Sequence, residues 1–245
     1  MELAMADSAR IWLVDQVNII PRSADVSLAA DLAGGNAASR RWPSTLRFHD
    51  RVGGRMVFAA PSLLTEPRNP VDGSNWLFDT MVTSALSDSA VLPDPWTGLH
   101  WPPRIAEAEG TVEAAAPVER SHAGLSLERR DVIPVPEDAW IDWDSEAGRL
   151  VTVGEKHPDG VTARTRTRIR YEDGYLERHW HDGSQVSIAD LIAPWILTFA
   201  RADDASDLFD PGHVARFEAF QRHYRGWRIL ATDPLEVEIY SAQIY

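Results

Sequence analysis

The stretch from Tyr171 to Arg201 constrains the fold of this chain more than any other segment. It contains the turn cluster His-Asp-Gly-Ser at residues 181–184, in which the glycine can adopt a positive φ and the aspartate can accept backbone hydrogen bonds. Ser187 precedes Asp190 by the three residues of a capping box, so we expect a helix that begins at Ile188. The segment therefore predicts a strand, a turn and a helix in succession.

The predicted helix has one wide apolar face. Pro194 lies inside it, and because proline lacks a backbone donor and crowds the preceding turn, we expect a kink or a break there. The apolar residues recur at intervals of three and four positions, which predicts that they are buried together: Ile188, Leu191, Ile192, Trp195, Ile196 and Phe199.

Composition places the chain among globular proteins with a strong negative charge. The 245 residues are 44% hydrophobic, enough to bury one large core or two modest ones. A net charge of -13 argues against a nucleic-acid partner, because phosphates require a basic face. The absence of cysteine excludes disulfides, thiolate metal ligands and a cysteine nucleophile. Ten tryptophans fit either core packing or a surface for a partly polar ligand.

Sequence pattern divides the chain into an N-terminal segment, residues 1–44, and a lobe, residues 45–245. The first holds a predicted strand at 11–14 and a glycine loop at 34–36 without a phosphate-binding motif. The lobe has three parts: a Trp- and Pro-rich loop region at 61–104, a strand-rich insert at 105–160, and a strand-turn-helix-helix-hairpin at 161–245.

Shorter elements follow from apolar alternation and turn residues. We expect a hairpin from 45–48 and 56–60, a helix at 75–86, a helix from Asp210-Pro211 to Gly226, and a C-terminal hairpin around residues 232–235. Strands are expected at Val112, 125–127, 131–135, 140–143, 150–153 and 162–171.

The strand at 162–171 places Arg164, Arg166, Arg168 and Arg170 on one side. Four guanidinium groups can grip phosphate or carboxylate ligands. In so acidic a chain, however, we expect them to pair with acidic neighbours, and Glu236 and Glu238 on the last strand are the candidates.

One pair of side chains suggests metal chemistry. His179 and His181 point to the same side if the strand continues, and such a pair can bind zinc with a third ligand, for which His157 and His213 are available but not placed by spacing. The sequence has no GxSxG elbow and no HExxH helix, so we do not expect an enzyme.

The segment HWHDGSQVSIADLIAPWILTFARA resembles the WHDG segment of extracellular solute-binding proteins of family 5, the dipeptide and oligopeptide receptors of ABC importers. The segments NPVDGSNWLFDTMVTSALSDSAVLPDPWTGLHWPPRIAEAEG, IPVPEDAWIDWD and VARFEAFQRHYRGWRILATDPLEVEIYS resemble a subgroup of that family in the same order. The resemblance covers most of residues 45–245.

This resemblance implies an α+β fold: the mixed-sheet lobe of a type II, periplasmic-binding-protein-like receptor with two lobes, here incomplete. Such a receptor captures a peptide or similar solute between its lobes and delivers it to an ABC transporter permease, without cofactor or catalysis. The family is periplasmic or membrane-anchored outside the cell. This chain shows no secretory signal and no second lobe, so as written we expect it in the cytoplasm as a fragment.

The resemblance also assigns roles to residues. Trp180, His181, Asp182 and Gly183 match the structural turn, and the expected ligand contacts are Asn69, Ser74, Asn75 and Trp76, with Trp96 and Trp101 as weaker candidates. Two alternatives stay open: a metal-dependent hydrolase that uses His179 and His181, and a stand-alone protein-interaction module with the tryptophan-rich loops as its face.

Overall fold

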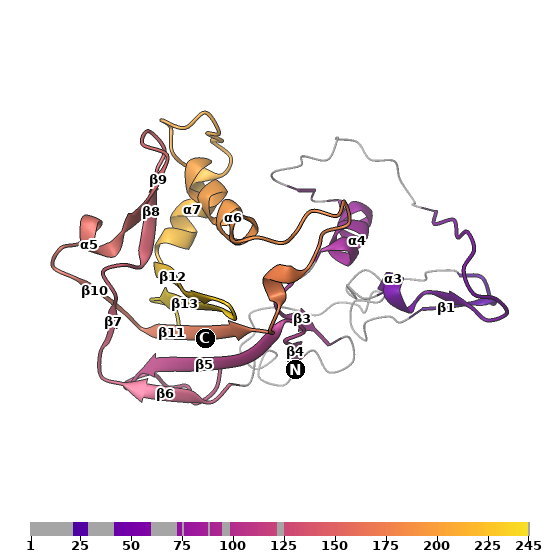
Figure 1. Ribbon diagram of the computed structural model, residues 1–245, viewed down its shortest axis with the longest axis horizontal. Coiled ribbons are helices and arrows are strands. Elements are labelled where there is room, and N and C mark those ends of the chain that lie inside the picture. Colours follow the sequence, from indigo (N-terminus) through magenta and orange to yellow (C-terminus); the bar gives the residue numbers. More distant parts are fainter. Residues whose placement is uncertain are drawn as a thin grey trace, which may run out of the picture. The chain divides into compact units, whose positions relative to one another are not determined.

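A computed structural model describes residues 22–28, 42–59, 73–74, 76–87, 89–94, 99–121 and 125–244 (Figure 1). The strand predicted at 11–14 and the glycine loop at 34–36 lie outside these ranges. The chain divides into two compact units, residues 1–87 and residues 88–245. The protein is a mixed α+β protein. None of the helices within the described ranges combines the length and the apolar character that a bilayer crossing needs.

The described residues of the first unit form two short strands and two helices. Strand β1 (Val26–Ser27) pairs antiparallel with β2 (Arg47–Phe48). Helix α3 (Trp42–Thr45) is joined to α4 (Leu77–Leu86) by the buried Trp42, whose indole nitrogen donates a hydrogen bond to the carbonyl of Met81 at 3.3 Å. The helix predicted at 75–86 is thus confirmed, with its start two residues later.

The hairpin predicted between residues 45–48 and 56–60 is wrong. Strand β2 pairs with β1, and residues 56–59 belong to no strand; Ala60 lies outside the described residues. Gly53 and Gly54 both have positive φ, and Val57 and Phe58 are exposed. Because this segment buries little apolar surface, nothing stabilises a second pairing.

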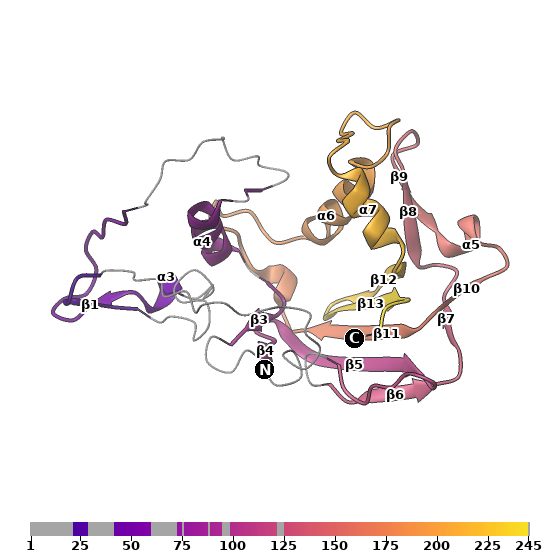
Figure 2. The ribbon, with the colours of Figure 1, turned by 180° about the vertical axis from the view of Figure 1, so that it is seen from behind.

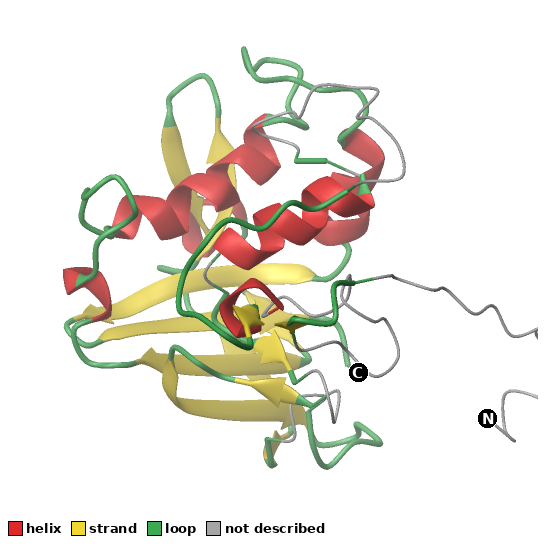
Figure 3. Cartoon of the chain, turned by 90° about the vertical axis from the view of Figure 1, so that its right-hand side faces the viewer, coloured by secondary structure: helices red, strands yellow, loops and turns green. Residues whose placement is uncertain are grey.

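The second unit is built on a seven-stranded mixed sheet with the strand order β6-β5-β11-β13-β12-β8-β9. Strands β5 and β6 are parallel, and the other neighbours are antiparallel. Figure 3 shows the strands in yellow, side by side. The strands are β5 (Ile105–Glu113), β6 (Leu127–Arg130), β8 (Trp140–Asp144), β9 (Arg149–Thr152), β11 (Thr165–Tyr171), β12 (Tyr224–Thr232) and β13 (Leu235–Ser241).

One side chain holds the crossover between the parallel strands β5 and β6. Parallel neighbours need a long connection, which is most often a helix. Here the Arg129 guanidinium donates hydrogen bonds of 2.8–2.9 Å to three backbone carbonyls at the start of the crossover, those of Ala114, Ala116 and Val118. A planar fork of five donors suits this role, because no lysine could reach three acceptors with the same rigidity.

The single strand predicted at 162–171 is two strands. Strand β10 (Val161–Ala163) pairs with β7 (Ile133–Val135), whereas β11 pairs with β5 and β13. The chain leaves one sheet for the other at Arg164, whose backbone N–H donates to the carbonyl of Ser241 at 2.8 Å. The remaining small elements are β3 (Leu92–Pro93), β4 (His100–Trp101), α5 (Val153–Lys156) and the 3-10 turn η1 (Tyr175–Glu177).

Helix α6 (Ile188–Ala200) begins at Ile188, as predicted, and covers one face of the sheet. Its residues Ile188, Leu191 and Ile192 pack against a buried cluster from β12 and β13: Trp227, Leu235 and Val237. Figure 2 shows α6 and α7 on the same side of β12 and β13. Of the kink or break expected at Pro194, the break does not occur: the helix continues through the proline, which lies on its exposed side, where water can satisfy the freed carbonyl.

Helix α7 (Val214–Gln221) is shorter than predicted at both ends. Instead of starting the helix, the Asp210 carboxylate accepts a bond from the Gly212 amide at 2.9 Å and pairs with Arg201 at 2.6 Å. Gly226 does not end the helix but lies in β12 with φ of 146°. A Cβ there would come within 3.1 Å of Val135, so this glycine permits close packing on β7.

Candidate functional site

The segment with the strongest sequence signal folds into a tight turn. The backbone amide of Trp180 donates to the carbonyl of Ser184 at 2.8 Å, and the amide of Gly183, at φ of 87°, donates to the carbonyl of Trp180 at 3.0 Å. The Asp182 carboxylate accepts from the hydroxyl of Ser184 at 2.7 Å and from its amide at 2.9 Å. These bonds hold the pKa of Asp182 below its ordinary value.

The turn is joined to α6 by a single carboxylate oxygen, Oδ2 of Asp190. It accepts hydrogen bonds from the Ser187 amide at 2.7 Å, from the Ser187 hydroxyl at 3.2 Å and from the Trp180 indole nitrogen at 3.3 Å. The first is one half of the predicted capping box, and in the other half the Asp190 amide donates to the Ser187 hydroxyl. The Ser187 amide and then the indole lower the pKa of Asp190, so the carboxylate stays charged at neutral pH. We call this arrangement the Asp190 clamp.

The arginine strand pairs with acidic residues, as predicted. Arg168 contacts Glu236 at 2.6 Å, Arg166 contacts Glu238 at 3.8 Å, and both acids lie on the neighbouring β13. The two outer arginines of this row pair as well, Arg164 with Glu113 and Arg170 with Asp173. Each of the four guanidinium groups therefore has a carboxylate partner within the chain, which favours a structural role over capture of an external anion.

Glu238 is the most buried of these acids, with only 4% of its surface exposed. Its Oε2 accepts hydrogen bonds from the Tyr240 hydroxyl at 2.7 Å and from Arg228 at 2.8 Å. Burial alone raises the pKa of Glu238, but these two bonds and the charges of Arg228 and Arg166 outweigh burial, so its pKa is lowered. Burial and the neighbouring carboxylate raise the pKa of Tyr240. The buried Glu238 carboxylate is thus compensated by hydrogen bonds and by the charges of two arginines.

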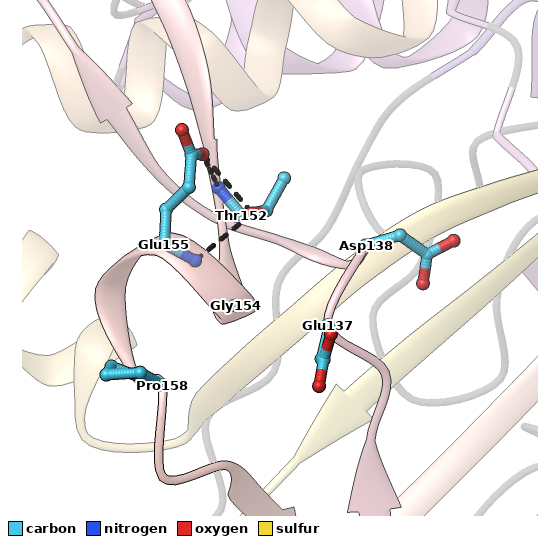
Figure 4. A pocket seen from close by; sticks show the side chains of 6 residues that line it. All are labelled: Glu137, Asp138, Thr152, Gly154, Glu155 and Pro158. Carbon is cyan, nitrogen blue, oxygen red and sulfur yellow. Dashed lines mark hydrogen bonds between the residues drawn. The ribbon is translucent and has the colours of Figure 1, made fainter.

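A hollow of about 490 Å³ lies beside this network and is lined by Glu137, Asp138, Thr152, Gly154, Glu155 and Pro158 (Figure 4). Two of its three carboxylates are already engaged. Asp138 pairs with Arg228 at 3.0 Å, and Glu155 pairs with Arg149 at 2.8 Å and caps α5 through the amide of Thr152 at 2.9 Å. The hollow therefore offers little free charge to a ligand.

The predicted ligand contacts fall in both units. Ser74 and Trp76 belong to the first unit, where the Ser74 hydroxyl accepts a bond from the Trp76 amide at 3.1 Å just before α4. Trp101 belongs to the second unit, on β4, with 60% of its surface exposed. Asn69, Asn75 and Trp96 lie outside the described residues. Their predicted contact with a ligand stays a prediction.

The strand does not continue to the paired histidines. The chain turns at η1, and His179 forms an isolated bridge with Gln185 while His181 lies in the turn; both are exposed. The buried His213 is engaged elsewhere, with Nε2 at 3.0 Å from the carbonyl of Thr198 in α6. Within the described ranges, no three His, Cys, Asp or Glu side chains come close enough together to hold a metal ion.

Sequence reasoning missed three members of the charged network: Arg228, Tyr240 and Asp138. Tyr240 continues the alternation of Glu236 and Glu238 along β13, so the period of two carried a signal for it. Arg228 follows from the hairpin register, in which it lies opposite Glu238. Asp138 comes from a distant loop and had no local signal.

Comparison with known proteins adds no relative. No protein-family model matches the chain, and no curated protein matches it.

Proposed function

We propose that this chain is part of the N-terminal lobe of a two-lobed solute-binding receptor of the type II, periplasmic-binding-protein-like class. It would capture a peptide or similar solute and deliver it to the permease of an ABC importer. The observation that carries the proposal is the Asp190 clamp, in which the resembling segment HWHDGSQVSIAD builds a turn and launches a buried helix on a mixed sheet.

The clamp supports a binding role because its polar groups are engaged in structure. Asp182 and Asp190 each accept several hydrogen bonds, and their lowered pKa values make them poor proton donors or acceptors near neutral pH. A receptor needs no such chemistry. It needs a rigid lobe, and ligand contacts to both lobes then favour the closed state by their differential affinity.

The proposal places ligand contact on the loops and not on the clamp. Ser74, Trp76 and Trp101 are the described candidates, together with Asn69, Asn75 and Trp96. The exposed Trp101 suits contact with a peptide, since indole rings supply a large contact area at low entropic cost. The receptor would act in the periplasm or on the outer surface of the membrane, with the second lobe and the permease as its protein partners.

Peptide binding by the natural protein, with every segment that its gene encodes, tests this proposal. Isothermal titration with a library of short peptides should find at least one ligand, and Trp101→Ala should weaken its Kd about tenfold through loss of an aromatic contact. The matched control is Trp180→Phe, which removes the indole hydrogen bond to Asp190 and should lower the Tm while leaving the Kd unchanged.

Two results would contradict the proposal. Absence of binding across the library would remove the receptor function. Stoichiometric zinc in the purified protein, lost together in His179→Ala and His181→Ala, would favour the hydrolase alternative instead.

A further inference from the structure

A second hollow, of about 160 Å³, lies where η1 meets the turn between β12 and β13. Its apolar wall is formed by Tyr175, Leu176 and Pro234. Gln185, which follows the HWHDGS turn directly, helps to hold this wall in place, because its side-chain amide donates to the carbonyl of Leu176 at 2.8 Å. The hollow therefore joins two neighbouring segments, residues 174–177 and Gln185, to the distant turn at residues 232–235.

Two carboxylates complete the lining, those of Glu177 and Asp233, and no basic residue is among the lining residues. Both residues are exposed, and neither carboxylate forms a hydrogen bond or an ion pair with any residue in the described part of the chain. This separates the hollow from the one in Figure 4, where Asp138 and Glu155 already bind arginines. The smaller hollow thus combines an apolar wall with two negative charges that lack an internal cation.

Size limits what this hollow can take. Pockets that enclose a whole small ligand measure about 300–1,000 Å³. A hollow of 160 Å³ is too small for that and suits a single side chain. Arginine and lysine side chains have a matching form, because they lay an apolar stem along apolar surface and keep the charged head among polar partners. An ammonium or guanidinium head would gain charge-assisted hydrogen bonds from the carboxylates.

We propose that this hollow binds one lysine or arginine side chain of the captured peptide, with the stem against Tyr175 and Pro234 and the cation between Glu177 and Asp233. This inference rests on the proposed peptide-binding function and adds a preference for basic peptides. It gives Glu177 and Asp233 a cationic partner that the described residues do not supply.

The test compares two peptides that differ only in charge, Ala-Lys-Ala and Ala-norleucine-Ala, on the natural full-length protein. The wild type should bind the lysine peptide about tenfold more tightly, as expected for a charge-assisted contact. The double variant Glu177→Gln/Asp233→Asn should lose this preference and keep its affinity for the norleucine peptide. A control with the same loss of charge at exposed sites away from the hollow, Glu146→Gln/Asp207→Asn, should keep the preference.

The outcomes separate this inference from the receptor proposal. Equal affinity for both peptides, or a preference that survives in the double variant, would overturn the inference and leave the receptor intact. Failure of both peptides to bind would count against the receptor. Binding of a cation in the hollow would then be tested by titration with n-butylammonium, followed through the NMR signals of the Tyr175 ring. Shifts in the wild type that vanish in the double variant would support it, and no shifts would overturn it.

Discussion

The two faces of strand β13 are held by opposite kinds of interaction. On one face, Leu235 and Val237 are buried beneath α6 in an apolar cluster. On the other, Glu236 and Glu238 pair with arginines from β11 and β12, and the Tyr240 hydroxyl donates to Glu238. A single seven-residue strand therefore contributes both an apolar core and a charged network. Burial of the first is non-directional, whereas the second depends on which residues lie opposite each other.

The charged face carries a regular row across four strands. Glu109 of β5 lies opposite Arg168 of β11, which lies opposite Glu238 of β13, which lies opposite Arg228 of β12. Charges thus alternate in sign from strand to strand. A slip of one residue would turn this row to the apolar face and bring Val237 to the charged side. Helix α6 thus stabilises the sheet, while the charged row specifies its register.

The largest effect is expected from Leu235→Ala on the apolar face. Leu235 is 1% exposed, so the change removes buried methyl groups and leaves a cavity, with a loss of about 3 kcal/mol in the free energy of unfolding. Urea denaturation measures it. The control is Ile239→Ala on the same strand, where 39% exposure predicts a loss below about 1 kcal/mol. Equal losses in the two variants would show that burial beneath α6 does not make Leu235 more important for stability than Ile239.

A smaller loss, about 2 kcal/mol, is expected from Glu238→Gln on the charged face. The amide keeps the shape of the side chain but removes the charge that compensates Arg228 in a partly buried position. The matched change Glu236→Gln, at a less buried acid, should cost no more than about 1 kcal/mol. If the two variants were equally stable, burial would not distinguish the two ion pairs.

The pH dependence of the free energy of unfolding should also reveal the contribution of Glu238. The folded-state pKa of Glu238 lies below the ordinary value of 4.5, so its stabilising contribution is present above about pH 4.5 and is lost as the pH falls through the folded pKa. The difference in free energy of unfolding between wild type and Glu238→Gln should therefore be constant near neutral pH and shrink in acid. A difference that grows below pH 4.5 would contradict a lowered pKa.

The smallest loss in the free energy of unfolding is expected from Arg168→Gln. Arg168 is partly exposed, and its pair with Glu236 should contribute only about 0.5 kcal/mol at low salt and less at 1 M salt because of screening. Arg216→Gln, at an exposed position on α7, serves as the control with the same change of charge. A loss as large as that of Glu238→Gln would mean that the whole charged row acts as one unit.

Local signals in the sequence were sufficient for several features. The capping box of Ser187 and Asp190 and the apolar face of α6 were predicted, because each depends on residues within a few positions. The pairing of Arg166 and Arg168 with Glu238 and Glu236 was also predicted, since alternation along each strand showed which residues share a side.

Features that depend on distant contacts could not be predicted. The break at Arg164 arises because β7 competes for residues 161–163, and the parallel β5–β6 pair depends on Arg129 and its three carbonyls. The smaller hollow likewise joins Glu177 to Asp233 through the folded chain. In each case the deciding partner is far away in sequence, so no local pattern marks it.

The Asp190 clamp links the HWHDGS turn directly to the start of helix α6. The same oxygen atom accepts hydrogen bonds from the indole of Trp180 and from the amide of Ser187 at the N-cap of α6, so this half-exposed ring is tied to the start of the helix. The last turn of the thirteen-residue α6 contains Phe199, which packs edge-on against Phe217 in the aromatic core. A partner that bound to Trp180 would therefore contact a residue that is linked, through α6, to the buried aromatic core.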